Sequence, residues 1–378
     1  MLAALARGMP GNYPDVPAYK EPVGTFVSLY AGAGGMDIGF ALAGFQPTWV
    51  NELDPHAVAT HELALKRLSE SRPHLATGQW SVHTGNLLDL AGDELPTAGE
   101  ADLVIGGPPC QGFSVAGRMD PEDKRSQHVL HFLEIVTRVR PRAFVLENVR
   151  ALLSNRRWAA IREQMAAAAT AAGYQTRFFL CEASHFGVPQ ARERMFFVGV
   201  RDGSAARSPT PTTATKRPTL RQALASLPRF GDPGNDSICR ARVTPAKLPV
   251  IRRSPYAGML VNGAGRPMAL DKPALTLVST MGGNRTSIVD QLQIDEGADP
   301  WIVDYHNHLR NGGAPIDTVP QRMRRITVEE AAAIQTFPLG MEWQGPQSAQ
   351  YRQIGNAVPP RLALAVAEAL KRSLGLRS

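Results

Sequence analysis

The chain has 378 residues, of which 43% are hydrophobic and 20% charged, and its formal net charge is +7. Three cysteines are too few for a disulfide framework, and no run of about 18 apolar residues is present that could cross a bilayer. The length allows one large domain or two, and the basic excess fits a polyanionic partner. The first seven residues lack the pattern of a signal peptide, so we expect a reducing, cytoplasmic location.

The predicted elements alternate between strands and helices. Residues 1–22 show no clear periodicity and are expected to form a loosely held leader. Six short apolar runs are predicted strands: 25–30, 47–51, 102–106, 142–147, 174–181 and 194–200. Four stretches between them are predicted helices: 36–43, 55–69, 127–139 and 156–172. This alternation predicts an α/β fold with a parallel, doubly wound sheet.

The composition changes near residue 203. Residues 203–320 are rich in Gly, Pro, Ser, Thr and Arg and show no strong helical periodicity, and 205–320 contains 14 Lys or Arg against 9 acids. Helical patterns then return at 327–336 and 359–374. We therefore expect a large α/β domain that is interrupted by a smaller one, with the segments 20–204, 205–320 and 321–378.

The first predicted strand leads into a glycine-rich turn, Tyr30–Gly35, which would let a ligand approach the backbone closely. Asp37 stands where a dinucleotide-binding fingerprint has its third glycine. Glu52, at the end of the second predicted strand, is placed to accept hydrogen bonds from ribose hydroxyls. Asn86, after Gly85, is a further candidate for binding the same ligand. Together these residues favour an adenosine cofactor that is not a dinucleotide.

A single thiol follows the strand predicted at 102–106, on the loop Gly106–Gln111. Two prolines fix φ ahead of Cys110, so the sulfur is aimed as a nucleophile would be. The alternative is an inert buried cysteine. The motifs around it favour the nucleophile.

Seven motifs occur in one order along the chain: Tyr30–Gly35, Glu52 with Asp54, Pro108–Gln111, Glu147–Val149, Gln190–Arg194, Arg325–Pro338 and Gly355–Pro359. In these motifs and their order the chain resembles a DNA (cytosine-5)-methyltransferase of the bacterial type, from about Thr25 to about Arg372. The resemblance implies a Rossmann-like methyltransferase fold with an inserted target-recognition domain, expected at 205–320. It also implies site-specific methylation of carbon 5 of a cytosine in duplex DNA.

The resemblance further implies the catalytic roles. Cys110 is expected to add to carbon 6 of the cytosine, because carbon 5 alone is too weak a nucleophile to attack a methyl sulfonium. Glu147 is expected to bind the exocyclic amine and ring nitrogen, with a pKa raised by enclosure. Arg194 is expected to contact the carbonyl oxygen of the base, and Arg192 to support the thiol loop and phosphate. One of the two arginines could instead be only an ion-pair partner of Glu147 or Glu193.

The cofactor that the resemblance implies is S-adenosylmethionine, and no metal is expected. Ten residues are expected to bind it: Leu29, Tyr30, Gly32, Gly34, Gly35, Glu52, Leu53, Asn86, Pro108 and Asn356. The family usually has an acid at the position of Asn86, but the asparagine carbonyl can accept the same hydrogen bond from an adenine amine. Ser28 stands where an aspartate is common, and we expect little consequence. His306 and His308 have no third ligand nearby and are interpreted as surface or core histidines.

The target base must be rotated out of the duplex, so DNA contacts are expected from two regions. The loop that follows the thiol is expected to close over the base and to contribute Gln111, Ser114, Arg118 and Arg125. The predicted recognition domain is expected to read base edges through Arg266, Thr276, Asn284 and Arg285. The alternative for each loop residue is a solvated position without DNA contact.

The expected partner is double-stranded DNA, in the bacterial cytoplasm at the nucleoid and without a membrane. One flipped base needs no dimer, so we expect a monomer. A tRNA cytosine-5 methyltransferase is an alternative that the long insertion between Arg194 and Arg325 disfavours. A non-catalytic DNA-binding relative is a second alternative, which the retained catalytic residues disfavour. The sequence leaves open the recognition site and whether a cognate restriction endonuclease acts separately.

Overall fold

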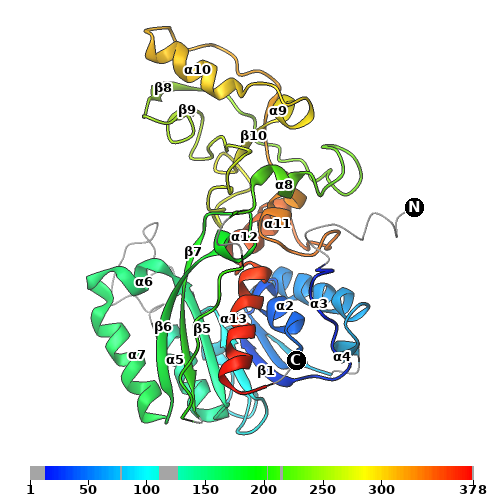
Figure 1. Cartoon of the computed structure of the whole chain (residues 1–378), viewed down its shortest axis with the longest axis vertical. Coiled ribbons are helices and arrows are strands. Elements are labelled where there is room, and N and C mark those ends of the chain that lie inside the picture. Colours follow the sequence, from blue (N-terminus) through cyan, green and yellow to red (C-terminus); the bar gives the residue numbers. More distant parts are fainter. Residues whose placement is uncertain (1–12, 77–78, 110–126, 202, 213–215, 377–378) are drawn as a thin grey trace. The chain divides into compact units, whose positions relative to one another are not determined.

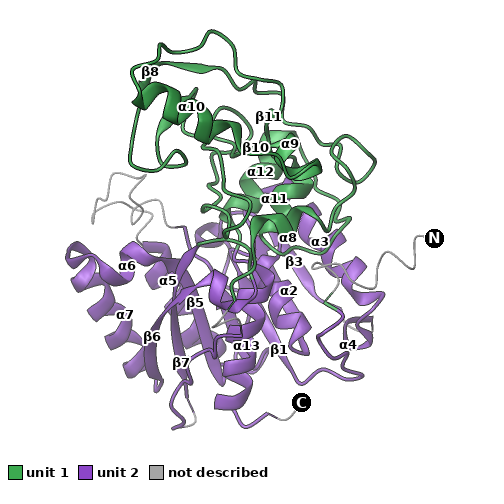
Figure 2. Ribbon diagram, turned by 45° about the horizontal axis from the view of Figure 1, so that its top comes forward, with its two compact units in different colours: residues 1–13, 188–191, 215–357 green, residues 14–187, 192–214, 358–378 purple. Residues whose placement is uncertain are grey.

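The computed structural model describes residues 13–76, 79–109, 127–201, 203–212 and 216–376. The chain forms two compact units (Figure 2). Unit 1 comprises the described residues within Met1–Tyr13, Val188–Ala191 and Thr215–Ala357. Unit 2 comprises those within Pro14–Gly187, Arg192–Ala214 and Val358–Ser378.

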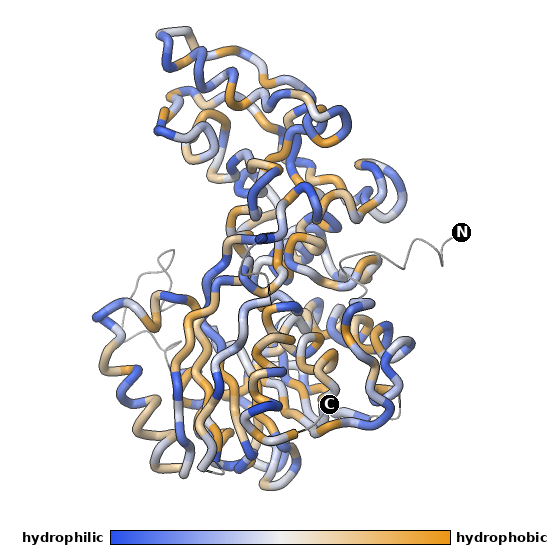
Figure 3. Tube along the Cα trace, in the orientation of Figure 1, coloured by the Kyte–Doolittle hydropathy of each residue, from blue (hydrophilic) through white to orange (hydrophobic). Residues whose placement is uncertain are grey.

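Unit 2 is built on a seven-stranded sheet with the strand order β3-β2-β1-β4-β5-β7-β6 (Figure 1). The strands are β1 (Gly24–Leu29), β2 (Phe45–Glu52), β3 (Ser81–Thr84), β4 (Leu103–Gly106), β5 (Ala143–Val149), β6 (Gln175–Glu182) and β7 (Glu193–Val200). Strands β1 to β5 pair in parallel. The central strands are apolar along most of their length (Figure 3), as expected for a sheet covered on both faces.

Helices cover both faces of this sheet. They are α2 (Gly35–Leu42), α3 (Pro55–Ser69), α4 (Pro73–Ala76), α5 (Gln127–Val139), α6 (Arg150–Ser154), α7 (Ala159–Ala171) and α13 (Pro360–Ser373), with the 3-10 turns η1 (Leu87–Asp89), η3 (Arg156–Trp158) and η4 (Ala183–Phe186). Val27 of β1 packs in a core cluster with Phe132 of α5, whereas Ser28 donates a hydrogen bond to Asp37 of α2. Successive strand residues point to opposite faces, so α5 and α2 lie on opposite faces. The predicted doubly wound α/β fold is confirmed.

Strand β7 runs antiparallel between β5 and β6, which corrects the expectation of a parallel sheet throughout. Residues 183–192, including η4, join β6 to β7. A parallel crossover needs about a dozen residues or more, so this connection returns the chain in the opposite direction. As a result, Arg194 at the start of β7 lies opposite Val149 at the end of β5.

Strand β3 was absent from the predicted strands. It has only four residues, Ser81–Thr84, and none of them is fully buried. Its pairing partner is β2, with Thr84 opposite Glu52. A short edge strand of mixed polarity carries no apolar run, so its position is fixed by the neighbouring strand rather than by its own sequence.

Unit 1 contains short elements around a small core. They are α8 (Leu220–Leu224), β8 (Pro245–Val250), β9 (Met259–Val261), β10 (Ile288–Asp290), α9 (Gln291–Asp295), α10 (Trp301–Arg310), β11 (Met323–Arg325), α11 (Val328–Ile334) and α12 (Gln347–Asn356). Two antiparallel pairs, β8-β9 and β10-β11, form its sheets. Apolar residues of β9, β10, α10 and β11 share one core cluster.

Helix α10 corrects the expectation that residues 203–320 lack strong helical periodicity. Its buried residues Ile302, Tyr305, His306 and Leu309 follow the spacing of one helical face. Residues 321–357 also belong to unit 1, because β11 pairs with β10 and α11 packs against α8. The predicted boundary at residue 320 is therefore not a boundary between compact units. Among the described residues, no helix combines the length and apolarity needed to span a bilayer.

Candidate active site

The predicted residues of unit 2 come from the carboxyl ends of neighbouring strands. Leu29 ends β1, Glu52 ends β2, Gly106 ends β4, and Glu147 lies in the second half of β5. The carboxyl ends of parallel strands meet at one edge, which is where open α/β sheets bind ligands. We call this region the strand-end edge.

The turn between β1 and α2 has left-handed backbone at Tyr30, Gly32 and Gly34, with φ of 57°, 57° and 81°. A Cβ on Gly34 would lie 2.5 Å from Cδ2 of His61, so this position has no room for another residue. A Cβ on Gly32 would meet nothing within 4 Å. Gly35 follows as the first, buried residue of α2. The turn therefore fits the predicted close approach of a ligand to the backbone.

The carboxylate of Glu52 connects the glycine-rich turn to the end of β2. Its Oε2 accepts a hydrogen bond from Gly32 N at 2.8 Å, and its Oε1 accepts one from Asp54 N at 2.8 Å. Both oxygens keep further lone pairs, since an ionised carboxylate has about four acceptor sites. Glu52 is thus held in a fixed orientation with acceptors remaining for the predicted ribose hydroxyls.

Asn86 caps the short turn η1. Its Oδ1 accepts a hydrogen bond from Leu88 N at 3.3 Å, and its Nδ2 donates to Asp89 Oδ2 at 3.0 Å. A carbonyl oxygen has two lone pairs, so one acceptor site remains for the predicted adenine amine. Leu53, after the end of β2, is 65% exposed and presents the apolar surface that a flat base would cover.

Three other predicted cofactor residues differ in exposure. Leu29 is fully buried in the core cluster, so its side chain packs inside the protein. The half-buried Tyr30 has its hydroxyl 3.0 Å from Nδ1 of His128, and burial raises the pKa of Tyr30. Pro108 is buried, and its carbonyl accepts a hydrogen bond from Asn148 Nδ2 at 3.1 Å.

Cys110 lies outside the described residues, as do Gln111, Ser114, Arg118 and Arg125. The segment that leads to Cys110 is described. A Cβ on Gly107 would lie 3.0 Å from Oε2 of Glu147, and the carbonyl of Pro108 is bonded to Asn148. Asn148 of β5 therefore binds the backbone shortly before the predicted nucleophile, and Glu147 lies close to the same segment. Asn148 is a supporting residue that its motif alone does not identify.

The structure brings Glu147 and Arg194 together from two separate motifs. Nε of Arg194 lies 2.8 Å from Oε1 of Glu147, and the side chains are 14% and 10% exposed. Burial raises the pKa of Glu147 above its usual value, although the charges of Arg194 and Arg192 act in the opposite direction. Glu147 therefore holds its proton to a higher pH than an exposed carboxyl does.

Arg192 is fully buried, and its carbonyl accepts a hydrogen bond from Ala183 N at 2.8 Å. Its guanidinium contributes positive charge near Glu147. This burial fits the predicted support of the thiol loop better than the predicted support of phosphate. The neighbouring Glu193 pairs with Arg150 at 2.7 Å near the surface.

A buried polar network that the sequence did not predict lies behind the glycine-rich turn. Asp37 Oδ1 accepts a hydrogen bond from Ser28 Oγ at 2.8 Å, and its Oδ2 lies 2.8 Å from His61 Nε2. All three side chains are buried, and the His61 ring lies against Gly34. The position of Asp37 in the first turn of a helix is the sequence feature that could have pointed to this network. The partner of Asp37 is not predictable from spacing, because His61 belongs to another helix.

In unit 1, all four predicted base-reading side chains are hydrogen-bonded within the protein. Arg266 Nη1 donates to Gly258 O at 3.0 Å, and Thr276 Oγ1 donates to Ala191 O at 2.6 Å. Asn284 Oδ1 accepts from Asn262 Nδ2 at 3.2 Å. Their role in base reading stays a prediction.

The fourth, the exposed Arg285, makes a 3.3 Å hydrogen bond to Thr280 Oγ1. Thr276 lies outside any strand, and Ala274, two residues before it, forms an isolated bridge with Gln190. Leu275, between them, is 44% exposed.

Asn356 is the exposed last residue of α12 in unit 1, and its predicted cofactor contact stays a prediction. Two further motif residues of unit 1 have a structural role. The buried amides of Gln190 and Gln335 pair at 3.1 Å, and Gln335 Nε2 donates to Ile354 O at 2.7 Å. His306 and His308 each bond to a carbonyl, of Arg252 and Ala314 respectively.

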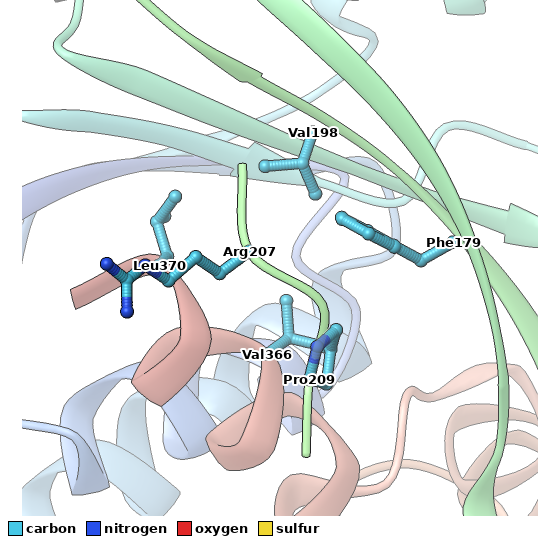
Figure 4. Close-up of a pocket in the computed structure, with 6 residues that line it drawn as sticks. All are labelled: Phe179, Val198, Arg207, Pro209, Val366 and Leu370. Carbon is cyan, nitrogen blue, oxygen red and sulfur yellow. The ribbon is translucent and has the colours of Figure 1, made fainter. Parts of the chain in front are cut away.

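Unit 2 also has a small apolar pocket between β6, β7 and α13 (Figure 4). Its lining residues are Phe179, Val198, Arg207, Pro209, Val366 and Leu370. The space admits about one water molecule. None of the predicted site residues lines it, so we interpret it as a packing gap beneath α13.

The chain matches known proteins along most of its length. The family described as C-5 cytosine-specific DNA methylase matches residues 24–372. Type II methyltransferase M1.HphI of Haemophilus parahaemolyticus is 30% identical over 356 residues, which cover 92% of this chain and 86% of the relative. Type II methyltransferase M.AplI of Arthrospira platensis is 32% identical over 350 residues, with 92% and 86% covered.

Solved structures agree with the fold. The Entamoeba histolytica methyltransferase EhMeth matches with a TM-score of 0.64 at 15% identity, covering 94% of this chain and 99% of its own. The S. pombe Dnmt2 methyltransferase matches with a TM-score of 0.61 at 16% identity, covering 93% and 98%. The resemblance inferred from the seven motifs is confirmed. The chain belongs to the C-5 cytosine-specific DNA methylase family.

Proposed function

We propose that this DNA cytosine-5 methyltransferase acts through a covalent adduct between Cys110 and carbon 6 of a cytosine rotated out of duplex DNA. The observation that carries the proposal is the pair of the buried Glu147 with the half-buried Arg194, beside the backbone that leads to Cys110. The relatives named above are type II methyltransferases, which supports a short, specific target site.

The residues of unit 2 fit S-adenosylmethionine as the methyl donor. The left-handed turn with Gly34 leaves backbone free of side chains, and Glu52 offers oriented acceptors for ribose hydroxyls. The exposed Leu53 and the capped Asn86 offer an apolar contact and an acceptor for adenine. When bound, the cofactor supplies a methyl group activated by a sulfonium. No pyrophosphate contact is needed for this ligand.

Glu147 is proposed to protonate the ring while sulfur adds. The Cys110 thiolate forms a bond to carbon 6, and the electron density that enters the ring is neutralised at the ring nitrogen by the proton of Glu147. Carbon 5 then becomes nucleophilic enough to take the methyl group. Loss of the carbon-5 proton to water, departure of the Cys110 thiolate and return of the ring-nitrogen proton to Glu147 restore the aromatic ring and the starting enzyme.

Arg194 is proposed to hold both Glu147 and the base. Its Nε bonds to Glu147, and its Nη1 donates to the carbonyl of Glu193 at 2.8 Å. A guanidinium has five N–H donors, so others remain for the carbonyl oxygen of cytosine. Stabilising that oxygen while sulfur adds lowers the barrier electrostatically.

Methyl transfer and the covalent step can be tested separately. The full-length protein is incubated with labelled S-adenosylmethionine and either duplex DNA or tRNA, with Cys110→Ala as the comparison. We expect label in DNA alone, none with Cys110→Ala, and a covalent complex with duplex DNA containing 5-fluorocytosine. Label in tRNA alone would establish the RNA alternative, and full turnover by Cys110→Ala would overturn the nucleophile.

We also propose a monomer that acts in the bacterial cytoplasm at the nucleoid, beside a separate restriction endonuclease with the same recognition site. The names of the relatives support the last point. Bisulfite sequencing of DNA from an expressing host would identify the site. An endonuclease activity from the source that methylated DNA resists would support the partner, and digestion of methylated DNA would contradict it.

A further inference from the structure

Residues 237–270 of unit 1 carry positive charge without any acid. This stretch, here called the cationic segment, contains six basic residues and no Asp or Glu: Arg240, Arg242, Lys247, Arg252, Arg253 and Arg266. It includes the hairpin β8-β9 and lies almost wholly outside the residues predicted to read bases. The chain as a whole has 34 acids, so their absence here is a local property.

Five of these cations are available for a partner. Arg240, Arg242, Lys247, Arg252 and Arg253 are exposed, and their side chains form no hydrogen bond or ion pair with any described residue. Arg266 is the exception, because it is half-buried and bonded to Gly258. Exposed cations without a partner in the protein can bind an anionic surface.

Apolar side chains are exposed among these cations. Leu248, at the centre of β8, is 87% exposed, Ile251 is 44% exposed and Met259 is 39% exposed. All three lie on or beside the paired strands β8 and β9, and a group of exposed apolar side chains marks a contact site. Cations combined with exposed apolar side chains match the surface of duplex DNA, where phosphates flank apolar base edges and steps.

The hairpin is held firmly from behind. Leu260 and Val261 of β9 pack in the core cluster with Ile302 and Tyr305 of α10. His306 Nε2 donates to the carbonyl of Arg252 at 2.7 Å, which fixes the chain just after β8.

The base of the hairpin is fixed in the same way. The buried Arg325 donates to the carbonyls of Ala241 and Thr286 at 3.1 and 2.6 Å. Asn262 Nδ2 donates to the carbonyl of Arg242 at 3.1 Å. The exposed side chains therefore start from a fixed backbone, which reduces the entropy lost on binding.

We propose that the cationic segment is a DNA-contacting surface, in which Lys247, Arg252 and Arg253 bind phosphates and Leu248 contacts base edges or a base step. The inference rests on the proposed function and adds a second contact region to the predicted base-reading residues. An anionic lipid surface also attracts cations, but the chain belongs to a family of DNA methylases, which favours DNA as the occupant.

The test uses the full-length protein and a labelled duplex that contains the site found by bisulfite sequencing. Binding is measured across a salt series for Lys247→Gln/Arg252→Gln/Arg253→Gln and for Leu248→Ser. Removing one cation that binds a phosphate makes the slope of log K against log salt shallower by about 0.9. Leu248→Ser is expected to weaken binding about 10-fold, the effect of exposing one leucine, with an unchanged slope.

The matched control removes three exposed cations from unit 2, Lys20→Gln/Lys66→Gln/Arg372→Gln, and is expected to change the slope by less than the equivalent of one phosphate. A wild-type slope and affinity in the hairpin triple variant, with methylation of DNA by the wild type intact, would overturn this proposal alone. Absence of methyl transfer to DNA by the wild type would instead overturn the proposed function. Binding to phosphatidylglycerol vesicles that the triple variant loses, with DNA binding unchanged, would assign the segment to a lipid surface and overturn the proposal.

Discussion

The strand-end edge of unit 2 and the cationic segment of unit 1 differ in whether their charged side chains have partners within the protein. At the strand-end edge, Glu52 is bonded by two backbone N–H groups, and Glu147 is paired with Arg194. In the cationic segment, Lys247, Arg252 and the other exposed cations have no side-chain partner among the described residues. In the first region, bonds within the protein fix the orientation of the charged groups. In the second region, most charged groups are available to bind a ligand.

This difference follows from what each region has to do. Bond formation at a ring carbon requires groups fixed before the substrate arrives, because reorganisation would raise the barrier. Phosphate binding depends on charge and tolerates small displacements, because the Coulombic attraction falls off slowly with distance. Substitutions in the first region should change turnover and folding, and substitutions in the second should change salt-dependent binding.

The largest expected effect is on turnover, at Glu147. Glu147→Gln removes the proton donor but keeps the shape, so we expect kcat to fall about 10²- to 10⁴-fold, the usual contribution of a general acid. Single-turnover methyl transfer with labelled cofactor measures it. The control is Glu193→Gln, which affects an exposed pair with Arg150 and should stay within a few fold. Equal losses in both variants would contradict the assignment.

The pH profile tests the same residue through its raised pKa. The donor must be protonated, so the rate should fall as the pH rises through the pKa of Glu147 in the enzyme. Arg194 and Arg192 lower this pKa while burial raises it more. Removing one positive charge in Arg194→Gln should therefore move the falling limb to higher pH, in addition to lowering kcat. If the rate of Arg194→Gln falls at the same pH as that of the wild type, a group other than Glu147 controls the pH dependence.

The next effect is on stability, at the buried network behind the glycine-rich turn. Asp37→Ala would leave Ser28 Oγ and His61 Nε2 without their shared acceptor. Each buried polar group left unpaired costs about 1–3 kcal/mol, so we expect a loss of several kcal/mol in urea unfolding. Asp37→Asn keeps an oxygen acceptor and should lose less. Equal unfolding midpoints for wild type and Asp37→Ala would show that the network contributes nothing.

A smaller effect is expected from two glycines of the same turn. Gly34→Ala combines a left-handed backbone, unfavourable by about 1–2 kcal/mol, with an overlap against His61 that adds about 1–3 kcal/mol. Gly32→Ala has only the backbone term, because its Cβ would stand in open space. Thermal unfolding and KM for S-adenosylmethionine should both rank Gly34→Ala as the more severe. The reverse ranking would contradict the described turn.

Much of the strand-end edge could be predicted because the sheet topology brings together residues that are distant along the chain. Glu52, Gly106 and Glu147 lie far apart in sequence, yet each lies at or near the carboxyl end of a strand. In a parallel sheet such positions converge, so recognising the strands was sufficient to group them. The motif order then supplied the chemistry.

The rest depended on interactions that no periodicity encodes. The Glu147–Arg194 pair requires β7 to enter the sheet antiparallel between β5 and β6, and this order is set by a short connection. The Asp37–His61 pair joins two helices. The cationic segment is visible as charge in the sequence, but only the structure separates its five exposed cations from the bonded Arg266. Which charged side chains face water is a tertiary property.

The smallest effect is expected within unit 1 and separates its two kinds of arginine. Arg253 is exposed and unpaired among the described residues, so Arg253→Gln should change the unfolding free energy by no more than about 0.5 kcal/mol, as at ordinary surface positions. Arg325 is buried and donates to two carbonyls, so Arg325→Gln should be far more destabilising. Urea unfolding measures both. A loss at Arg253 comparable with that at Arg325 would mean that the cationic segment is structural, because charge kept for DNA contributes to binding and leaves folding almost unchanged.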